Sequence, residues 1–137
     1  MKRRDARELT FKLTYEMVMT GEFNPDTLDG LASDLPKKAE IDDDSRKYIS
    51  SAVSGIREHR DELKALITKY ARGYEFDRIY KTDLAVLYLA CYELLYTDTP
   101  RAVIVNEAVE LAKSYSDVQS YSFVNGILAS VIKGDSE

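Results

Sequence analysis

The segment TDLAVLYLACYELLY, residues 82–96, constrains the fold of this chain more than any other part of the sequence. Apolar side chains would cover almost every side of a helix formed here, so that helix needs neighbours on several sides. Its longest charge-free stretch, from Leu84 to Tyr92, is far shorter than the roughly 20 residues that span a bilayer. We therefore expect a central, buried helix and no membrane segment.

The remaining chain also favours helices. Apolar residues recur at helical spacing, and no segment has the sustained alternation that is typical of a β-strand. We predict helices over 4–19, from 25 to a stop at Pro36, from Pro100 with Thr99 as its N-cap, and, after a polar break at 116–117, to about 133. This pattern predicts an all-α fold of about six to seven helices.

A long apolar stripe runs through residues 42–71. It places four residues seven apart, namely Ile49, Ile56, Leu63 and Tyr70. Such a stripe predicts a helical core face over many turns, but it leaves open whether the segment is one helix or two with a break near His59. Charged residues flank His59, and no second histidine or nearby cysteine accompanies it, so we expect a solvated surface position.

The Asn125-Gly126 dipeptide conflicts with a helical interpretation, because it is a strong hairpin signal between alternating strands. Its flanking residues have helical spacing, so we predict that the helix continues through it. A glycine inside a helix costs about 1 kcal/mol relative to alanine. That cost would be tolerated if the missing side chain lets another helix or a ligand backbone come close.

Length and composition indicate one domain over residues 1–137, or two closely packed helical subdomains, since 137 residues with 45% apolar content can bury one core. The single cysteine, Cys91, lies in an apolar run and is expected in that core within a reducing compartment. The first residues lack the apolar region of a secretory signal. Together these features predict a cytoplasmic protein.

The residue combinations of common catalytic and metal sites are missing from the sequence. It has one histidine and no CxxC, HExxH, EF-hand or phosphate-loop pattern. Carboxylate pairs such as Glu107 and Glu110 are more typical of a solvated helix face than of an acid–base pair. We therefore expect neither an enzyme nor a bound cofactor or metal.

Charge is distributed unevenly along the chain, whose net charge is −5. Residues 1–12 carry five basic and two acidic groups, a net +3, which leaves −8 for the remainder. Arginines followed by Phe11 and Tyr15 would suit phosphate contact together with stacking on unpaired bases. A charged helix start with core aromatics behind it is the alternative that composition leaves open.

Four segments, RRDARELTFKLTYE, DLAVLYLACYELLY, TPRAVIVNEAVELAKSYS and SFVNGILASVI, resemble the NusB family in order and spacing, over residues 3–132. The resemblance implies two packed helical bundles. It also implies binding of a boxA-type single-stranded RNA of ribosomal-RNA leaders, and pairing with NusE, a small-subunit ribosomal protein. Such a protein would act in an RNA polymerase antitermination complex and help the polymerase to read through terminators.

By position, the resemblance implies RNA contacts at the arginine-rich start, at an aromatic residue of the first helix, and at the junction of the last two helices. The matching residues are Arg3, Arg4, Arg7, Tyr15, Tyr115, Gln119, Ser120 and Phe123. Arginines would contact phosphates, the aromatic rings would stack on bases, and Gln119 and Ser120 would bind base edges. Core positions for Tyr115 and Phe123, and a solvated helix position for Arg7, remain alternatives.

The same resemblance implies that the helix containing YELLY faces NusE, with Asp83 as the candidate for pairing with a basic partner. Two departures from many relatives affect these sites. The chain has Val118-Gln119 where relatives have an acidic pair, and Tyr88 where they have a basic residue. We expect such changes to alter RNA preference and partner affinity rather than the fold.

The sequence is also compatible with two other functions. A helical protein-interaction adaptor without RNA binding would use the acidic surface to hold a basic protein. The chain could also act like the helical RNA-binding domain attached to some ribosomal-RNA methyltransferases, although it has no glycine-rich cofactor loop. Helical bundles of this size can also expose an apolar face that closes a homodimer.

Overall fold

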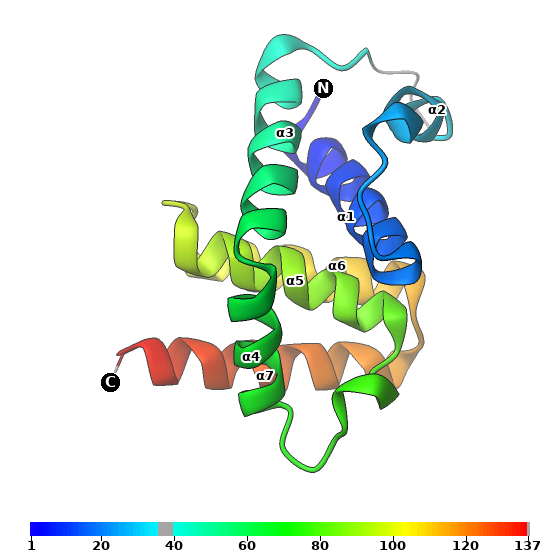
Figure 1. Cartoon of the computed structure of the whole chain (residues 1–137). Coiled ribbons are helices and arrows are strands. Elements are labelled where there is room, and N and C mark those ends of the chain that lie inside the picture. Colours follow the sequence, from blue (N-terminus) through cyan, green and yellow to red (C-terminus); the bar gives the residue numbers. More distant parts are fainter. Residues whose placement is uncertain (36–39, 137) are drawn as a thin grey trace.

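The computed structural model describes residues 1–35 and 40–136, and within them the chain forms helices and turns without a β-strand (Figure 1). This confirms the predicted all-α fold, whereas the predicted stop at Pro36 lies outside the described residues. The elements are α1 Arg3–Thr20, η1 Pro25–Thr27, α2 Leu28–Ser33, α3 Asp43–Glu58, α4 Arg60–Tyr70, η2 Phe76–Arg78, α5 Lys81–Tyr96, α6 Arg101–Tyr115 and α7 Val118–Ser136, of which η1 and η2 are 3-10 helices.

Helix α5 is the centre of the fold, as its apolar sequence predicts. Every residue from Asp83 to Glu93 is buried, including Cys91. The helix contacts α1, α3, α4, α6 and α7, so its apolar side chains are removed from water on several sides. Burial of each large aliphatic side chain stabilises the fold by about 1.5–3 kcal/mol. None of the helices in the described ranges combines the length and apolarity needed to cross a membrane.

The other helices form two groups around α5. In Figure 1, α1, α2 and α3 lie in the upper half, and α4 and α7 lie in the lower half with α6 behind α5. Helix α1 packs on α2, α3 and α5, whereas α7 packs on α4, α5 and α6. This arrangement agrees with the two packed bundles implied by the resemblance. It also places the start of α1 next to both α3 and α6.

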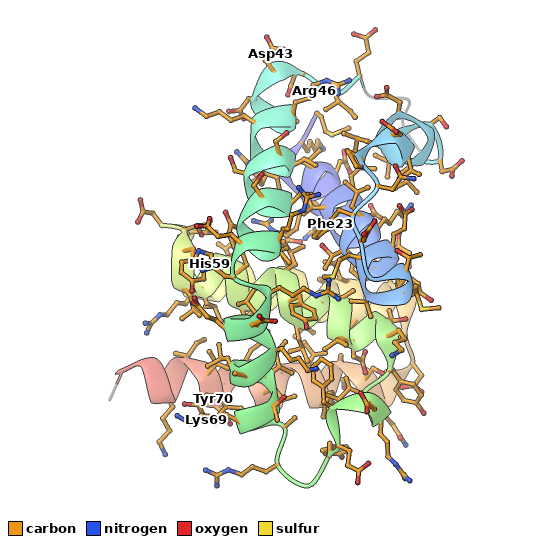
Figure 2. The ribbon with its side chains drawn as sticks, in the orientation of Figure 1. Phe23, Asp43, Arg46, His59, Lys69 and Tyr70 are labelled. Atoms are coloured by element: carbon orange, nitrogen blue, oxygen red, sulfur yellow. The ribbon has the colours of Figure 1, made fainter. Side chains whose placement is uncertain are left out.

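Helices α3 and α4 are separate, with the break at His59 (Figure 2). The apolar stripe over residues 42–71 therefore belongs to two helices rather than one. The His59 ring stacks on Tyr96 with ring centroids 3.9 Å apart, and 24% of its side chain is exposed. The expected solvated position is therefore wrong, because the end of α5 covers one face of the imidazole.

Helix α6 begins one residue later than the Thr99-Pro100 pattern predicts. Pro100 has a ψ of 135° and lies before the first helical residue, Arg101. Its carbonyl oxygen accepts hydrogen bonds from the backbone N–H groups of Val103 and Ile104. Thr99 Oγ1 instead accepts a hydrogen bond from Thr97 Oγ1, so the predicted threonine cap is wrong.

Helix α7 continues through Asn125-Gly126, which confirms the helical interpretation of that dipeptide. Gly126 is exposed, and a Cβ atom added to it would meet no other atom within 4 Å. Packing between the described helices therefore does not require this glycine. Gly55 differs, because a Cβ atom there would collide with the ring of Tyr92.

Candidate nucleic-acid interface

Two arginines are exposed in the first turn of α1. The side chains of Arg3 and Arg4 are 46% and 64% exposed. Arg3 Nη2 lies 3.4 Å from Asp44 Oδ2 of α3, and Arg4 Nε donates to Glu107 Oε2 of α6 over 3.1 Å. The hydrogen bond to Glu107 raises the pKa of Arg4. The start of α1 therefore presents two cations that are accessible to an anion but already contact carboxylates.

Arg7 lies one turn further along and is buried. Its Nε and Nη2 atoms donate to the two carboxylate oxygens of Glu93 over 2.8 and 3.0 Å, and Tyr48 Oη donates to Glu93 Oε1 over 2.7 Å. Burial opposes the charge on Arg7, but the hydrogen bonds to Glu93 together with the electrostatic attraction of Tyr48, Glu93 and Glu107 outweigh it and raise the arginine pKa. Arg3 lies over the Tyr48 ring, 4.2 Å from its centroid. This network joins α1 to α3 and α5.

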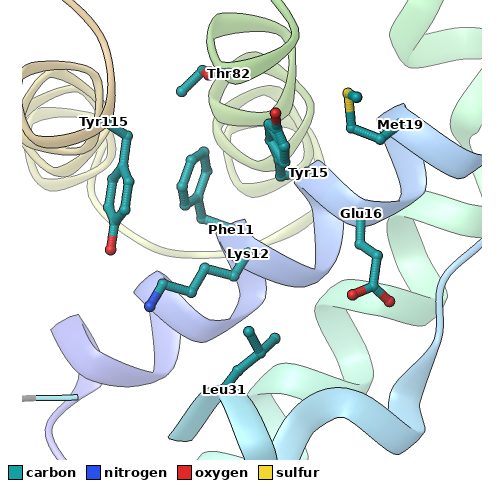
Figure 3. A pocket seen from close by; sticks show the side chains of 8 residues that line it. All are labelled: Phe11, Lys12, Tyr15, Glu16, Met19, Leu31, Thr82 and Tyr115. Atoms are coloured by element: carbon teal, nitrogen blue, oxygen red, sulfur yellow. The ribbon is translucent and has the colours of Figure 1, made fainter. Parts of the chain in front are cut away.

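A cavity of about 510 Å³ lies beside α1 (Figure 3). Side chains from α1, α2, α5 and α6 line it, namely Phe11, Lys12, Tyr15, Glu16, Met19, Leu31, Thr82 and Tyr115. Tyr115 is 39% exposed and Tyr15 is half-buried. The Phe11 and Tyr115 rings are 4.9 Å apart and inclined at 42°, so the cavity offers aromatic surface for a planar ligand.

Tyr115 also contacts Glu8 and Lys12 of α1. Its hydroxyl donates a hydrogen bond to Glu8 Oε1, which fixes the ring against α1. Burial, together with that hydrogen bond, raises the pKa of Tyr115. Lys12 Nζ lies 5.9 Å from the ring centroid, within the range of a cation–π contact. A positive charge therefore lies at the edge of the aromatic cavity.

A hydrogen bond to Asp83 connects the junction between α6 and α7 to α5. This residue is 1% exposed, and its Oδ1 accepts a hydrogen bond from Ser116 Oγ over 3.0 Å. Burial raises the pKa of Asp83, and the Ser116 and Ser120 hydroxyls partly offset that effect. Asp117 Oδ1 accepts from the backbone N–H groups of Gln119 and Ser120, both over 3.0 Å, and so caps the start of α7.

A second cavity, of about 200 Å³, has Asp83 in its lining. It is lined by the connection between α4 and α5 and by the start of α7, namely Tyr74, Arg78, Ile79, Tyr80, Asp83, Asp117, Gln119, Ser120 and Phe123. Gln119 is exposed, Phe123 is half-buried and Ser120 is buried. The Phe123 ring meets Tyr74 edge to face, with centroids 4.9 Å apart.

The structure groups five of the predicted RNA-binding residues around two cavities. Tyr15 and Tyr115 share the first cavity, and Gln119, Ser120 and Phe123 line the second. Exposure of Tyr115 excludes a position fully inside the core, whereas Phe123 is partly packed against the core. Arg7 and Asp83 differ, because each is buried among polar partners. The solvated position considered for Arg7 is therefore wrong, as is a surface position for Asp83.

The two departures from the family pattern have different surroundings. Tyr88 is buried, 3% exposed, and burial raises its pKa, with an opposing contribution from Arg60. Tyr88, where the family resemblance implies a basic residue, therefore lies at a core position of α5. Gln119 is exposed at the second cavity, where it can form hydrogen bonds.

Sequence reasoning missed Tyr74, Arg78 and Tyr80, which line the second cavity. These residues lie between two helices that are far better defined by periodicity. The segment KYARGYEFDRIYK, residues 69–81, contains a usable signal: four basic residues interleaved with aromatic ones. Only the folded chain places this segment beside Phe123.

Comparison with known proteins is consistent across sequence and structure. The model of the NusB family matches residues 4–133. The transcription antitermination protein NusB of Acetivibrio thermocellus is 39% identical over 97% of this chain and 90% of its own length. Its counterpart from Symbiobacterium thermophilum is 40% identical, over 98% of this chain and 91% of its own length.

Solved structures give the same result. The structure of T. maritima NusB is 30% identical, with a TM-score of 0.81 over 97% of this chain and 92% of that chain. A crystal structure of antitermination factors NusB and NusE in complex with dsRNA contains a chain that is 26% identical, with a TM-score of 0.81 over 96% of both chains. On the matched residues, the shared fold and the identity over nearly the whole length, this chain belongs to the NusB family.

Proposed function

We propose that this protein binds boxA-type single-stranded RNA from ribosomal-RNA leaders together with NusE, and so helps RNA polymerase to read through terminators. As a NusB-family member it is a transcription antitermination factor. The observation that carries the RNA proposal is that Tyr15 and Tyr115 line one cavity beside α1, the helix whose first turn exposes Arg3 and Arg4. Single strands are bound by this combination of stacking surfaces and cations.

Phosphate groups would contact Arg3 and Arg4. Both guanidinium groups are accessible, and both now contact carboxylates that a phosphate would replace. Because the protein carries a net charge of −5, attraction of RNA depends on this local positive region rather than on the whole surface. Binding should therefore weaken steeply as salt increases.

Bases would occupy the first cavity, where Tyr15 and Tyr115 provide aromatic faces. Phe123 would add a further face at the α6–α7 junction, and the exposed Gln119 amide can donate to or accept from a base edge. Ser120 is buried, so its role in this proposal is to support Asp83 and the start of α7.

Arg7 and Asp83 would act indirectly. Arg7 fixes the exposed turn of α1 against α3 and α5 through Glu93 and Tyr48. Asp83 fixes the α6–α7 junction, and so orients Tyr115 on one side and Phe123 on the other. Direct pairing of Asp83 with a basic partner would require it to leave this buried position.

NusE enters the proposal through the solved complex of a homologous NusB with NusE and dsRNA. The partner would contribute RNA contacts that an acidic protein lacks, and would join the adaptor to the polymerase antitermination complex. Because its ligand is a nascent transcript, the protein would act in the cytoplasm.

The direct test is fluorescence anisotropy with a labelled boxA-like strand and a scrambled strand, with NusE present. We expect tighter binding of the boxA-like strand. Equal binding of both strands would reject the RNA proposal and favour an adaptor that recognises only proteins. The variant Arg3→Gln/Arg4→Gln should bind RNA weakly, whereas Arg57→Gln/Lys133→Gln, which removes the same charge at exposed positions elsewhere, should bind normally.

A further inference from the structure

The connection between α4 and α5 combines exposed aromatic and basic side chains. We propose that Tyr74, Arg78 and Tyr80 form a second nucleotide-binding surface for the strand that enters the first cavity. This inference rests on the proposed function, which already assigns Gln119 and Phe123 of the second cavity to bases, and extends it to the α4–α5 connection on the same cavity. Its ligand is an unpaired, flanking segment of the same RNA.

Exposure is the first observation. Tyr80 is 70% exposed and Tyr74 is 58% exposed, the two highest values among the exposed large apolar or aromatic side chains of the described residues. Tyr74 is also oriented by its edge-to-face contact with Phe123. Every base presents a flat face that can stack on such rings without regard to sequence. Two accessible tyrosines, one of them held in place, are therefore suited to flanking nucleotides of variable sequence.

Charge is the second observation. Residues 69–81 contain four basic and two acidic groups, a net +2 within a chain of −5. The Arg78 side chain is 82% exposed, and its ion pair with Glu75 spans 3.7 Å between two equally exposed groups. Such a pair contributes little and is readily replaced by a phosphate. This segment is thus a second local positive region, separate in sequence from the start of α1.

Continuity with the first cavity is the third observation. Consecutive residues at the start of α5, Thr82 and Asp83, line different cavities. At the α6–α7 junction, Tyr115 lines the first cavity and Asp117 lines the second. The hydrogen bond from Ser116 to Asp83 joins the two segments between these residues. A strand that leaves the first cavity along this junction would reach the second.

The chemistry favours RNA over a protein at this surface. Tyrosine and arginine are common in protein interfaces as well as in RNA sites, so the net charge of the segment decides between the two. A basic protein attracted by the acidic body of this chain would be repelled by the +2 segment. Gln119 and Asp117 at the second cavity add polar groups that can meet base edges or ribose hydroxyls.

The test compares a boxA-like strand with strands extended by about four nucleotides at the 5′ or the 3′ end. We expect one extension to raise the affinity of the wild-type protein about tenfold. The variants Tyr80→Ser and Arg78→Gln should lose most of that gain while binding the unextended strand normally. Tyr96→Ser, at an exposed tyrosine at the other end of α5, should keep the gain.

A second measurement does not depend on variants. A photo-crosslinking base such as 4-thiouridine, placed in the extension, should attach to peptides containing Tyr74 or Tyr80, as read by mass spectrometry. The inference is overturned if the wild-type protein binds the boxA-like strand but gains nothing from either extension, or if Tyr80→Ser keeps the whole gain. Loss of NusE binding in Tyr80→Ser, with the extension gain kept, would instead assign the surface to the protein partner. Failure to bind any strand would reject the proposed function itself.

Discussion

The Arg7 guanidinium and the Glu93 carboxylate form a two-point hydrogen-bonded ion pair inside the protein, over 2.8 and 3.0 Å. The two side chains are 6% and 1% exposed, and the residues are 86 positions apart in sequence. Tyr48 of α3 also donates a hydrogen bond to Glu93, so the pair connects three helices. The arginine-rich start of α1 therefore has an inner arginine that holds the helix and two outer arginines that are exposed to a ligand.

Removing one partner of this pair should be costly. Arg7→Ala leaves the Glu93 carboxylate buried without its main counterion, so we expect a loss of about 3–5 kcal/mol in the free energy of unfolding. The double variant Arg7→Leu/Glu93→Leu should lose much less, because no unpaired charge remains. Urea denaturation measures both. A loss below about 1 kcal/mol in Arg7→Ala would mean that the pair behaves like a surface ion pair.

Asp83 predicts a pH dependence of stability. Burial raises its folded pKa above the ordinary value of 3.8. Its contribution to stability is therefore fully present below that ordinary value and is lost as pH rises through the folded pKa. Asp83→Asn, which can still accept from Ser116, should lack this loss. Urea unfolding at about pH 4 and about pH 7 should show the variant gaining stability relative to wild type at the higher pH. A constant difference would contradict the raised pKa.

Much of the fold follows from local sequence patterns. Helix α5 is predictable because apolar residues on every side of a helix leave it no position except the centre. The break at His59 is not, because the apolar stripe keeps its phase across it and the covering ring of Tyr96 comes from a distant segment. Apolar periodicity predicts which face of a helix is buried, but it does not predict where one helix ends and the next begins.

The site is less predictable than the fold for the same reason. Arg3 and Arg7 are indistinguishable in the sequence, yet one is exposed and the other is buried against Glu93. Tyr74 gains its place at the site only from its contact with Phe123, 49 positions later in the chain. Roles that depend on partners distant in sequence require the folded structure.

The carboxylates beside the exposed arginines should restrain RNA binding. Asp44 and Glu107 occupy the positions where phosphates would meet Arg3 and Arg4. Asp44→Asn and Glu107→Gln should therefore increase RNA affinity by up to about fivefold each, since an exposed ion pair contributes up to about 1 kcal/mol. The gain should be similar for boxA-like and scrambled strands, and Asp43→Asn serves as a neighbouring control. Unchanged affinity would mean that phosphates bind elsewhere.

The aromatic cavity gives a prediction about ring faces. Tyr15→Ser should weaken binding of a boxA-like strand by about 5- to 100-fold, because it removes one stacking surface. Tyr15→Phe should bind nearly as well as wild type, because the face is kept. At position 115, Tyr115→Phe keeps the ring but loses the hydrogen bond to Glu8, so a moderate loss is expected there. Anisotropy titrations distinguish these cases, and equal losses for the Ser and Phe variants at position 15 would rule out stacking.

Gly126 allows stability and binding to be separated. Its added Cβ would meet open space, so Gly126→Ala should raise the free energy of unfolding by about 1 kcal/mol. Gly55→Ala is the opposite control, because its Cβ collides with Tyr92 and should destabilise the protein. An exposed helical glycine that costs stability is explained if a partner backbone approaches it closely. Weaker assembly with NusE or RNA by the more stable Gly126→Ala protein would support that explanation, and unchanged assembly would remove it.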